Sequence, residues 1–174
     1  MICPRVSAIR IAAVLLAVVV TAAAAVAAFA TTKPDSFRVE RSLTIKAPAS
    51  QVFPLVNDLS AWEHWSPWAK LDPAMETTLS GAASGLGAVY EWSGNSDVGS
   101  GRMEIIDMTP PSTVRIRLDF FTPFESTNRV EFSFDPIDEY TDVTWRMDGP
   151  MPYLSKLISV FVSMDAMIGP DFES

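Results

Sequence analysis

Residues 113–134, TVRIRLDFFTPFESTNRVEFSF, carry the clearest structural pattern in the chain. In its first half, apolar and charged side chains alternate: Val114, Ile116, Leu118 and Phe120 against Arg115, Arg117 and Asp119. The same alternation returns from Arg129 to Phe134, after a connection that contains Thr122-Pro123. A period of two predicts strands with one buried face. Because the connection is short, the two strands must run antiparallel.

The alternation extends outward from this pair in both directions. Together with turn residues between the segments, it predicts seven strands, at about residues 37–46, 75–80, 87–93, 102–108, 113–121, 129–134 and 143–147. Two Gly-rich segments, 81–87 and 94–101, separate some of them. Neither segment is followed by a helix or by Lys-Ser/Thr, which a phosphate-binding loop requires. The sequence therefore predicts an α+β domain built on one antiparallel sheet.

Three helices are expected around these strands. A short helix opens at Pro48, with Pro54 limiting its length, and a second spans residues 59–65. The segment Gly149-Pro150-Met151-Pro152 ends the sheet and begins a long C-terminal helix. Apolar residues recur there at helical spacing: Leu154, Leu157, Ile158, Phe161, Met164 and Ile168. This stripe is expected to pack on the sheet, with Phe161 among the packed residues.

The N-terminal segment is apolar enough to cross a bilayer. Ile11–Ala30 contains one polar side chain, and twenty helical residues span about 30 Å. The basic residues before it predict a cytoplasmic segment 1–10, a single-pass anchor 11–30, a linker 31–36 and an extracytoplasmic domain 37–174. The alternative is a signal peptide cut near Ala30, which would leave a secreted or periplasmic domain.

Composition excludes several classes of function. Residues 31–174 carry 11 basic and 21 acidic groups, which argues against nucleic acid as a partner. The chain has one cysteine, Cys3, and one histidine, His64, so no metal site, disulfide framework or thiol chemistry is expected. We therefore expect no cofactor. His64 is the one side chain suited to act as a base near neutral pH. The alternative interpretation is an exposed histidine without a catalytic role.

Several motifs carry a family resemblance that runs from about Phe37 to Ser174. They are Ala47-Pro48 with Val52-Phe53, Trp62-x-x-Trp65-Ser66-Pro67-Trp68, Tyr90-x-Trp92-x-Gly94-Asn95, Gly99-x-Gly101-Arg102-Met103 and Ser163-Met164-Asp165. In these the chain resembles the START/Bet v 1-like (SRPBCC) superfamily, specifically its bacterial polyketide cyclase/dehydrase-type members. The resemblance implies a helix-grip fold, in which a curved seven-stranded antiparallel sheet and two short helices grip a long C-terminal helix over a hydrophobic cavity.

The candidate ligand-binding residues follow from this layout. They are Trp65, Trp68, Tyr90, Arg102, Phe120, Trp145, Phe161 and Met164. Arg102 would hold a ligand carboxylate if its side chain pointed inward, or pair with acids across strands if it did not. The tryptophans would line a ligand entrance or dip into a membrane interface, or else pack in the core. Glu91 would be a buried acid only if it faced inward.

Three functions fit the sequence. The first is a membrane-tethered binding module whose partner is a hydrophobic or amphipathic small molecule or lipid. The second is a polyketide cyclase/dehydrase-like enzyme that uses His64 or an inward acid. The third is an interaction domain with a collapsed cavity. No residue forms a catalytic signature, so we expect binding rather than catalysis.

Overall fold

A computed structural model describes residues 4–172 of the chain. Its contacts divide the chain into two compact units, each described by itself below. The N-terminal unit comprises the chain up to Asp35 together with Met151–Ser163. The sheet unit comprises Ser36–Pro150 and the chain from Met164.

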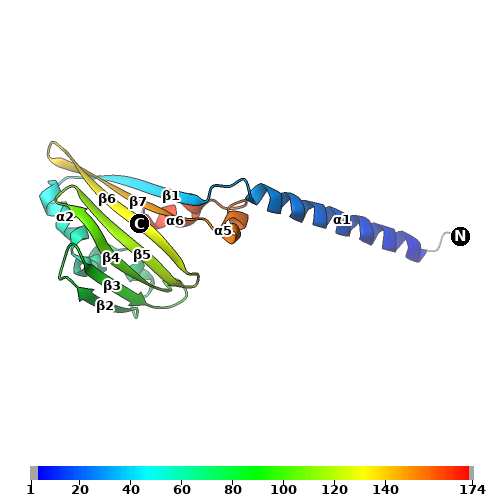
Figure 1. Ribbon diagram of the computed structural model, residues 1–174, viewed down its shortest axis with the longest axis horizontal. Helices are drawn as coiled ribbons and strands as arrows, with labels where there is room; N and C mark the ends of the chain where they lie inside the picture. The colour runs from blue at the N-terminus through cyan, green and yellow to red at the C-terminus, as the bar shows by residue number, and fades with distance from the viewer. Residues whose placement is uncertain (1–3, 173–174) are drawn as a thin grey trace. The chain divides into compact units, whose positions relative to one another are not determined.

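The sheet unit is built on one seven-stranded sheet in which every neighbouring pair is antiparallel (Figure 1). The strands are β1 (Ser36–Ile45), β2 (Glu76–Gly81), β3 (Ala88–Ser93), β4 (Ser100–Thr109), β5 (Thr113–Thr122), β6 (Ser126–Ile137) and β7 (Tyr140–Pro150). Their order across the sheet is β1-β7-β6-β5-β4-β3-β2. The seven-stranded antiparallel sheet of the α+β fold class is therefore confirmed.

The two faces of this curved sheet differ in chemistry, because side chains alternate along each strand: one is mainly apolar and the other mainly charged. The concave face carries the apolar set, and Ile105, Val114, Ile116 and Phe134 on this face are at most 1% exposed. Short helices that follow β1 pack on it: α2 (Ala49–Asn57), the 3-10 helix η1 (Leu59–Ala61), α3 (Trp62–Trp65) and α4 (Trp68–Leu71). The core of the unit lies between them and the sheet.

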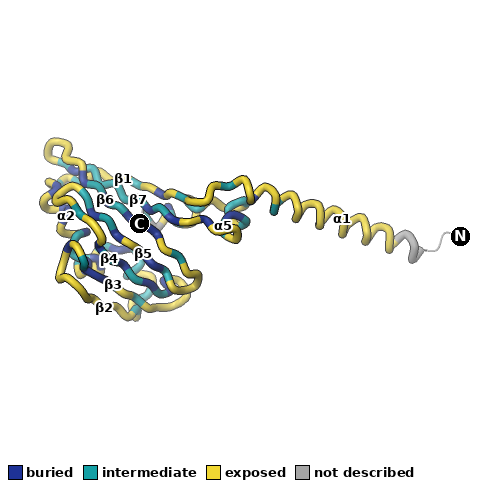
Figure 2. Tube along the Cα trace, in the orientation of Figure 1, coloured by how far each residue is buried: buried dark blue, intermediate teal, exposed yellow. Residues whose placement is uncertain are grey.

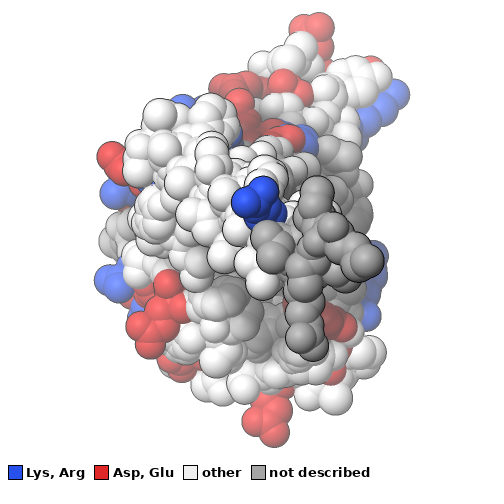
Figure 3. Space-filling view, turned by 90° about the vertical axis from the view of Figure 1, so that its right-hand side faces the viewer, with Lys and Arg blue, Asp and Glu red and all other residues white. Residues whose placement is uncertain are grey.

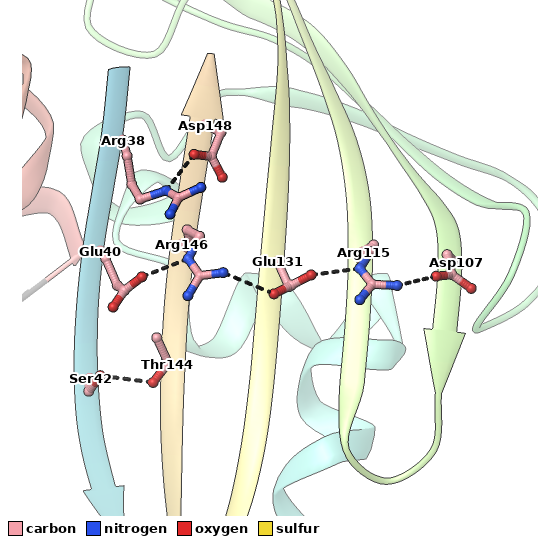
Figure 4. A network of polar contacts seen from close by, with 9 residues as sticks. All are labelled: Arg38, Glu40, Ser42, Asp107, Arg115, Glu131, Thr144, Arg146 and Asp148. Carbon is pink, nitrogen blue, oxygen red and sulfur yellow. Dashed lines mark hydrogen bonds and ion pairs between the residues drawn. The ribbon is translucent and has the colours of Figure 1, made fainter. Parts of the chain in front are cut away.

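The convex face carries a row of alternating charges that crosses five strands (Figure 4). Arg146 on β7 bonds Glu40 on β1 at 2.6 Å and Glu131 on β6 at 3.3 Å. Arg115 on β5 continues the row, from Glu131 at 2.6 Å to Asp107 on β4 at 2.5 Å. Hydrogen bonds to these acids raise the pKa values of Arg115 and Arg146. Acid–base neighbours of this kind fix strand register and leave the convex face to water.

The N-terminal unit contains helix α1 (Pro4–Ala30) and the short helix α5 (Tyr153–Ile158). Along the part of α1 whose side chains are described, residues 8–30, almost every side chain is exposed (Figure 2). Ala8–Ala30 is long and apolar enough to cross a membrane, and a signal sequence would have the same properties. The expected apolar N-terminal helix is thus present.

The C-terminal region differs from the long helix expected from its periodicity. It forms two short helices, α5 and α6 (Met164–Phe172), separated by Ser159–Ser163. Past α5 the amides of Val160 and Phe161 bond carbonyls three residues back, and the Ser159 hydroxyl donates to the Lys156 carbonyl oxygen at 2.8 Å. Serine and β-branched valine both disfavour the helix interior, so the helix tightens and ends.

The position of Phe161 is therefore corrected. Its side chain is 76% exposed, so it belongs to no packed stripe. The residues of this region that do pack on the sheet core are Ile168 and Phe172 of α6.

Two phenylalanines provide a matched test of this core. Phe134→Ala removes a ring that is 1% exposed, and we expect it to lower the free energy of unfolding by about 3–5 kcal/mol. Phe161→Ala removes an exposed ring and should change it by less than about 0.5 kcal/mol. Urea unfolding of the full chain in detergent, followed by circular dichroism, measures both. Equal losses would contradict the assignment of the core.

Candidate functional site

An aromatic cluster on the concave face surrounds Trp145 of β7. Its ring stacks on Phe132 of β6, with centroids 5.0 Å apart, and on Phe172 of α6 at 4.0 Å. Trp65 of α3 and Trp68 of α4 approach it edge-on at 6.1 and 5.6 Å. Residues from four separate segments thus converge on one side chain. Three of the candidate ligand-binding residues, Trp65, Trp68 and Trp145, lie together here, and all three are half-buried.

The Trp145 indole differs from its neighbours in hydrogen bonding. Among the described residues, its buried Nε1 has no hydrogen-bond partner. By contrast, Nε1 of Trp62, Trp65 and Trp92 each donates to a backbone carbonyl oxygen, at 3.1, 2.9 and 3.0 Å. A buried indole N–H normally has an acceptor. The concave side of the sheet therefore holds one buried hydrogen-bond donor without an acceptor, enclosed by apolar rings.

A second aromatic group lies on β3 and β5. Trp92 contacts Tyr90 at 6.4 Å and Phe120 at 5.7 Å between ring centroids. Its ring lies against Gly101, where an added Cβ would stand 2.4 Å from it, so only glycine fits beneath the ring. Burial, and then the charge of Glu63, raise the pKa of the Tyr90 phenol. Tyr90 and Phe120 thus lie on the concave side of the sheet, opposite Met103 and Gly101 on β4.

An ion pair lies on the same face. Arg41 pairs in register with Trp145, which places it on the concave side of β1. Its guanidinium donates to both carboxylate oxygens of Asp165 on α6, at 2.7 and 3.1 Å, and this contact lowers the pKa of Asp165. Sequence reasoning missed Arg41. The signal was present, because Arg41 stands between Val39 and Leu43 in the alternation that defines the inward face.

Arg102 lies on the opposite side of the sheet from the aromatic cluster. Its neighbours Gly101 and Met103 are buried inward, so its own side chain is on the convex face. There it donates to Glu104 at 2.8 Å and lies 3.9 Å from Glu91. Of the two orientations open for Arg102, the structure has the outward one, with Glu91 opposite it on β3, so its candidate role as a ligand contact is corrected. Glu91 faces outward too, and its side chain is 48% exposed.

The remaining candidates lie apart from the cluster in different ways. Met164 is half-buried at the start of α6, and Phe161 is exposed in the N-terminal unit, as described above. The His64 side chain is 77% exposed and lies 3.6 Å from Glu63. Of the two interpretations of His64, a base or an exposed histidine, the structure has the exposed histidine. Among residues 4–172, no group of three or more His, Cys, Asp or Glu is arranged to hold a metal ion.

One hollow of about 200 Å³ lies at the β2 end of the sheet unit. It is lined by Leu59, Leu79, Ser80, Gly81, Ala82, Ala83, Ala88 and Val89. This volume is below the ~300–1,000 Å³ typical of small-molecule sites. It also holds none of the aromatic residues named above. The aromatic concave face, rather than this hollow, is the candidate site.

Known proteins share this architecture. Protein MLL2253 from Mesorhizobium loti is 16% identical, with 79% of this chain and 91% of that chain covered and a TM-score of 0.54. Norcoclaurine synthase from Thalictrum flavum, a point mutant in complex with a transition state analogue, is 10% identical, with coverages of 79% and 95% and a TM-score of 0.57. Protein Ms6760 from Mycobacterium smegmatis is 18% identical, with 78% of this chain and 83% of that chain covered and a TM-score of 0.52. At such identities the likeness shows the fold alone.

At the level of sequence, no curated protein matches the chain. A family described as "Polyketide cyclase / dehydrase and lipid transport" matches residues 36–169, which include the whole sheet and most of α6. The match agrees with the motifs that resemble the START/Bet v 1-like (SRPBCC) superfamily and with the helix-grip neighbours. By this match the chain belongs to the polyketide cyclase / dehydrase and lipid transport family of the SRPBCC superfamily.

Proposed function

We propose that this protein is a membrane-tethered binding module for a hydrophobic or amphipathic small molecule, such as a lipid, held on the aromatic concave face. The observation that carries the proposal is Trp145, a ring surrounded by other aromatic rings whose buried Nε1 has no partner among the described residues. An acceptor on an otherwise apolar ligand would satisfy this donor. The family's description, which includes lipid transport, supports the same class of ligand.

The polar groups on this face support binding over catalysis. Arg41 and Asp165 are engaged with each other, and His64, the chain's single histidine, is exposed on α3 with Glu63 as its neighbour. General acid–base catalysis needs a titratable group within hydrogen-bond reach of the bound substrate. The cyclase-like alternative therefore has less support than the binding module, although the family includes such enzymes by description.

The membrane tether rests on α1. Its apolar segment Ala8–Ala30 would cross the bilayer once, and Arg10 at its start would remain on the cytoplasmic side. The sheet unit would then face the extracytoplasmic side of the cell (inner) membrane. Because only a few residues separate Ala30 from β1, the linker would keep the sheet unit near the membrane surface.

Binding at Trp145 is testable with a conservative variant. Trp145→Phe keeps an aromatic ring but removes the indole N–H. We expect it to weaken binding of the amphipathic probe anilinonaphthalene sulfonate by about two- to tenfold, the effect of one hydrogen bond. Fluorescence titration of the full chain, with a protein-free detergent blank subtracted, measures the affinity.

His64→Ala is the control for this titration, because the His64 side chain is 77% exposed and lies outside the aromatic cluster. Its affinity for the probe should equal that of the unchanged chain. Equal affinity in Trp145→Phe and the unchanged chain would argue against Trp145 as the ligand contact. An equal loss in both variants would argue against a localised site.

The tether predicts the behaviour of the protein in cell fractions. The full chain should stay with membranes after washes with high salt and with alkaline carbonate, because a spanning helix is held by burial of its apolar surface rather than by charge. Immunoblotting of the fractions and N-terminal sequencing of the product measure this. A soluble product that begins at Thr31 would establish the cleaved signal peptide instead.

A further inference from the structure

The N-terminal unit reverses the usual order of burial. Lys156 on α5 is buried, with 9% of its surface exposed, whereas Leu154 is 60% and Phe161 76% exposed. Tyr153 and Ile158 are also about half exposed, at 48% and 46%. In a protein surrounded by water, lysine is among the residues least often buried. Apolar side chains exposed in this number on one short segment indicate that an apolar medium covers them.

The Lys156 side chain is covered along its length, and its amine reaches the surface, where the Asp35 side chain is 99% exposed. Lys156 Nζ donates to Asp35 Oδ1 at 2.5 Å, and this hydrogen bond lowers the pKa of Asp35. The Met151 amide donates to the Asp35 carbonyl oxygen at 2.8 Å. Asp35 thus ties the segment around α5 to the end of the short linker that follows α1. Lys156 is thus held by Asp35, while the apolar side chains of the same segment remain exposed.

A hydrogen bond places the start of α5 beside the C-terminal end of α1. The Tyr153 hydroxyl donates to the carbonyl oxygen of Ala27, at 3.2 Å. Ala27 is three residues before the end of α1 at Ala30, which is about 4.5 Å along the helix axis. Lys33 Nζ, beyond that end, lies 5.1 Å from the centre of the Phe29 ring. Tyr153 therefore lies at the last turn of the apolar span. Charged residues begin directly after this turn, with Lys33 and Asp35.

The geometry points to a second membrane contact in this protein: the α5 segment, residues 153–163, lies in the interface of the bilayer that α1 crosses. Leu154, Ile158 and Phe161 would enter the boundary between headgroups and acyl chains. The phenol of Tyr153 would lie at headgroup level, the usual place of tyrosine at membrane interfaces. The partner is phospholipid, because the exposed apolar surface is continuous with the end of the span. This inference rests on the proposed tether.

Uncharged surface is extensive in the view of Figure 3, where acidic and basic side chains are interspersed toward the edges. No concentrated basic patch appears on the face shown there. Within residues 153–163 the one charged side chain, Lys156, is paired with Asp35, so an interfacial contact made by α5 would depend on apolar burial more than on attraction to anionic lipid. We expect it to persist at high salt.

Site-directed spin labelling tests the inference on the full chain. Cys3 is replaced (Cys3→Ser), and a single cysteine is introduced as Phe161→Cys, as Val19→Cys in the middle of α1, or as Phe124→Cys. Phe124 is the matched control, because its ring is 72% exposed but belongs to the sheet unit. The labelled proteins are reconstituted in vesicles of phosphatidylcholine and phosphatidylglycerol. Collision rates with oxygen, which dissolves in lipid, and with a water-soluble nickel chelate are then compared.

We expect labels at positions 161 and 19 to favour oxygen, the latter more strongly, and the label at position 124 to favour nickel. Oxygen preference at position 19 with nickel preference at 161 would overturn the interfacial contact and leave the tether intact. Nickel preference at position 19 would overturn the tether, and the contact with it. A label at position 161 shielded from both reagents would indicate a protein partner or a second copy, and would overturn the inference. Equal oxygen preference at positions 161 and 124 would also contradict it.

Discussion

The alternation of side chains along seven antiparallel strands is the constraint on which the sheet unit depends. It assigns every charge of the row from Glu40 to Asp107 to one face and the apolar residues to the other. The charged face is stable in contact with water. The apolar face must be covered, because exposed apolar area costs roughly 25 cal/mol for each Å². The elements that cover it therefore determine what the protein can bind.

That covering is made by aromatic rings. Segments far apart in the chain, α3, α4, β6 and α6, bring rings to Trp145, and the result is a half-buried apolar surface with one unsatisfied donor. A purely structural core would have little reason to leave an indole N–H without an acceptor, since an unpaired buried donor costs about 1–3 kcal/mol. Under the proposed function, the ligand would supply this acceptor.

The sequence predicted the strands well, because period-two patterns depend on local chemistry that the fold preserves. It also identified Trp65, Trp68, Tyr90, Phe120 and Trp145 as residues that share the concave region. It left the orientation of Arg102 open, because the family motif suggested function although the alternation assigns this residue to the convex face. Sequence reasoning also overlooked Arg41, which the alternation assigns to the concave face. In both residues the position in the strand, rather than the residue type, determines the face.

The C-terminal helix shows a different limit of sequence reasoning. Periodicity reports that a segment has an apolar stripe, but not which apolar medium the stripe contacts. The stripe from Leu154 to Ile168 was expected to meet the sheet throughout. In the structure only α6 packs on the core, while α5 and Phe161 leave their apolar side chains exposed beside the end of α1. Serine and valine at 159–163 separate these two environments.

The central claim, that a ligand binds at the aromatic concave face, is tested most directly by the indole N–H resonances of the chain's five tryptophans. They are recorded by NMR on the full chain in lipid nanodiscs, with and without a fatty acid as the probe, and the Trp145 signal is assigned with Trp145→Phe. We expect the Trp145 resonance to move most, and the resonances of Trp62 and Trp92, whose N–H groups donate to backbone carbonyl oxygens, to stay in place. An unmoved Trp145 resonance, or equal shifts in all five, would contradict it.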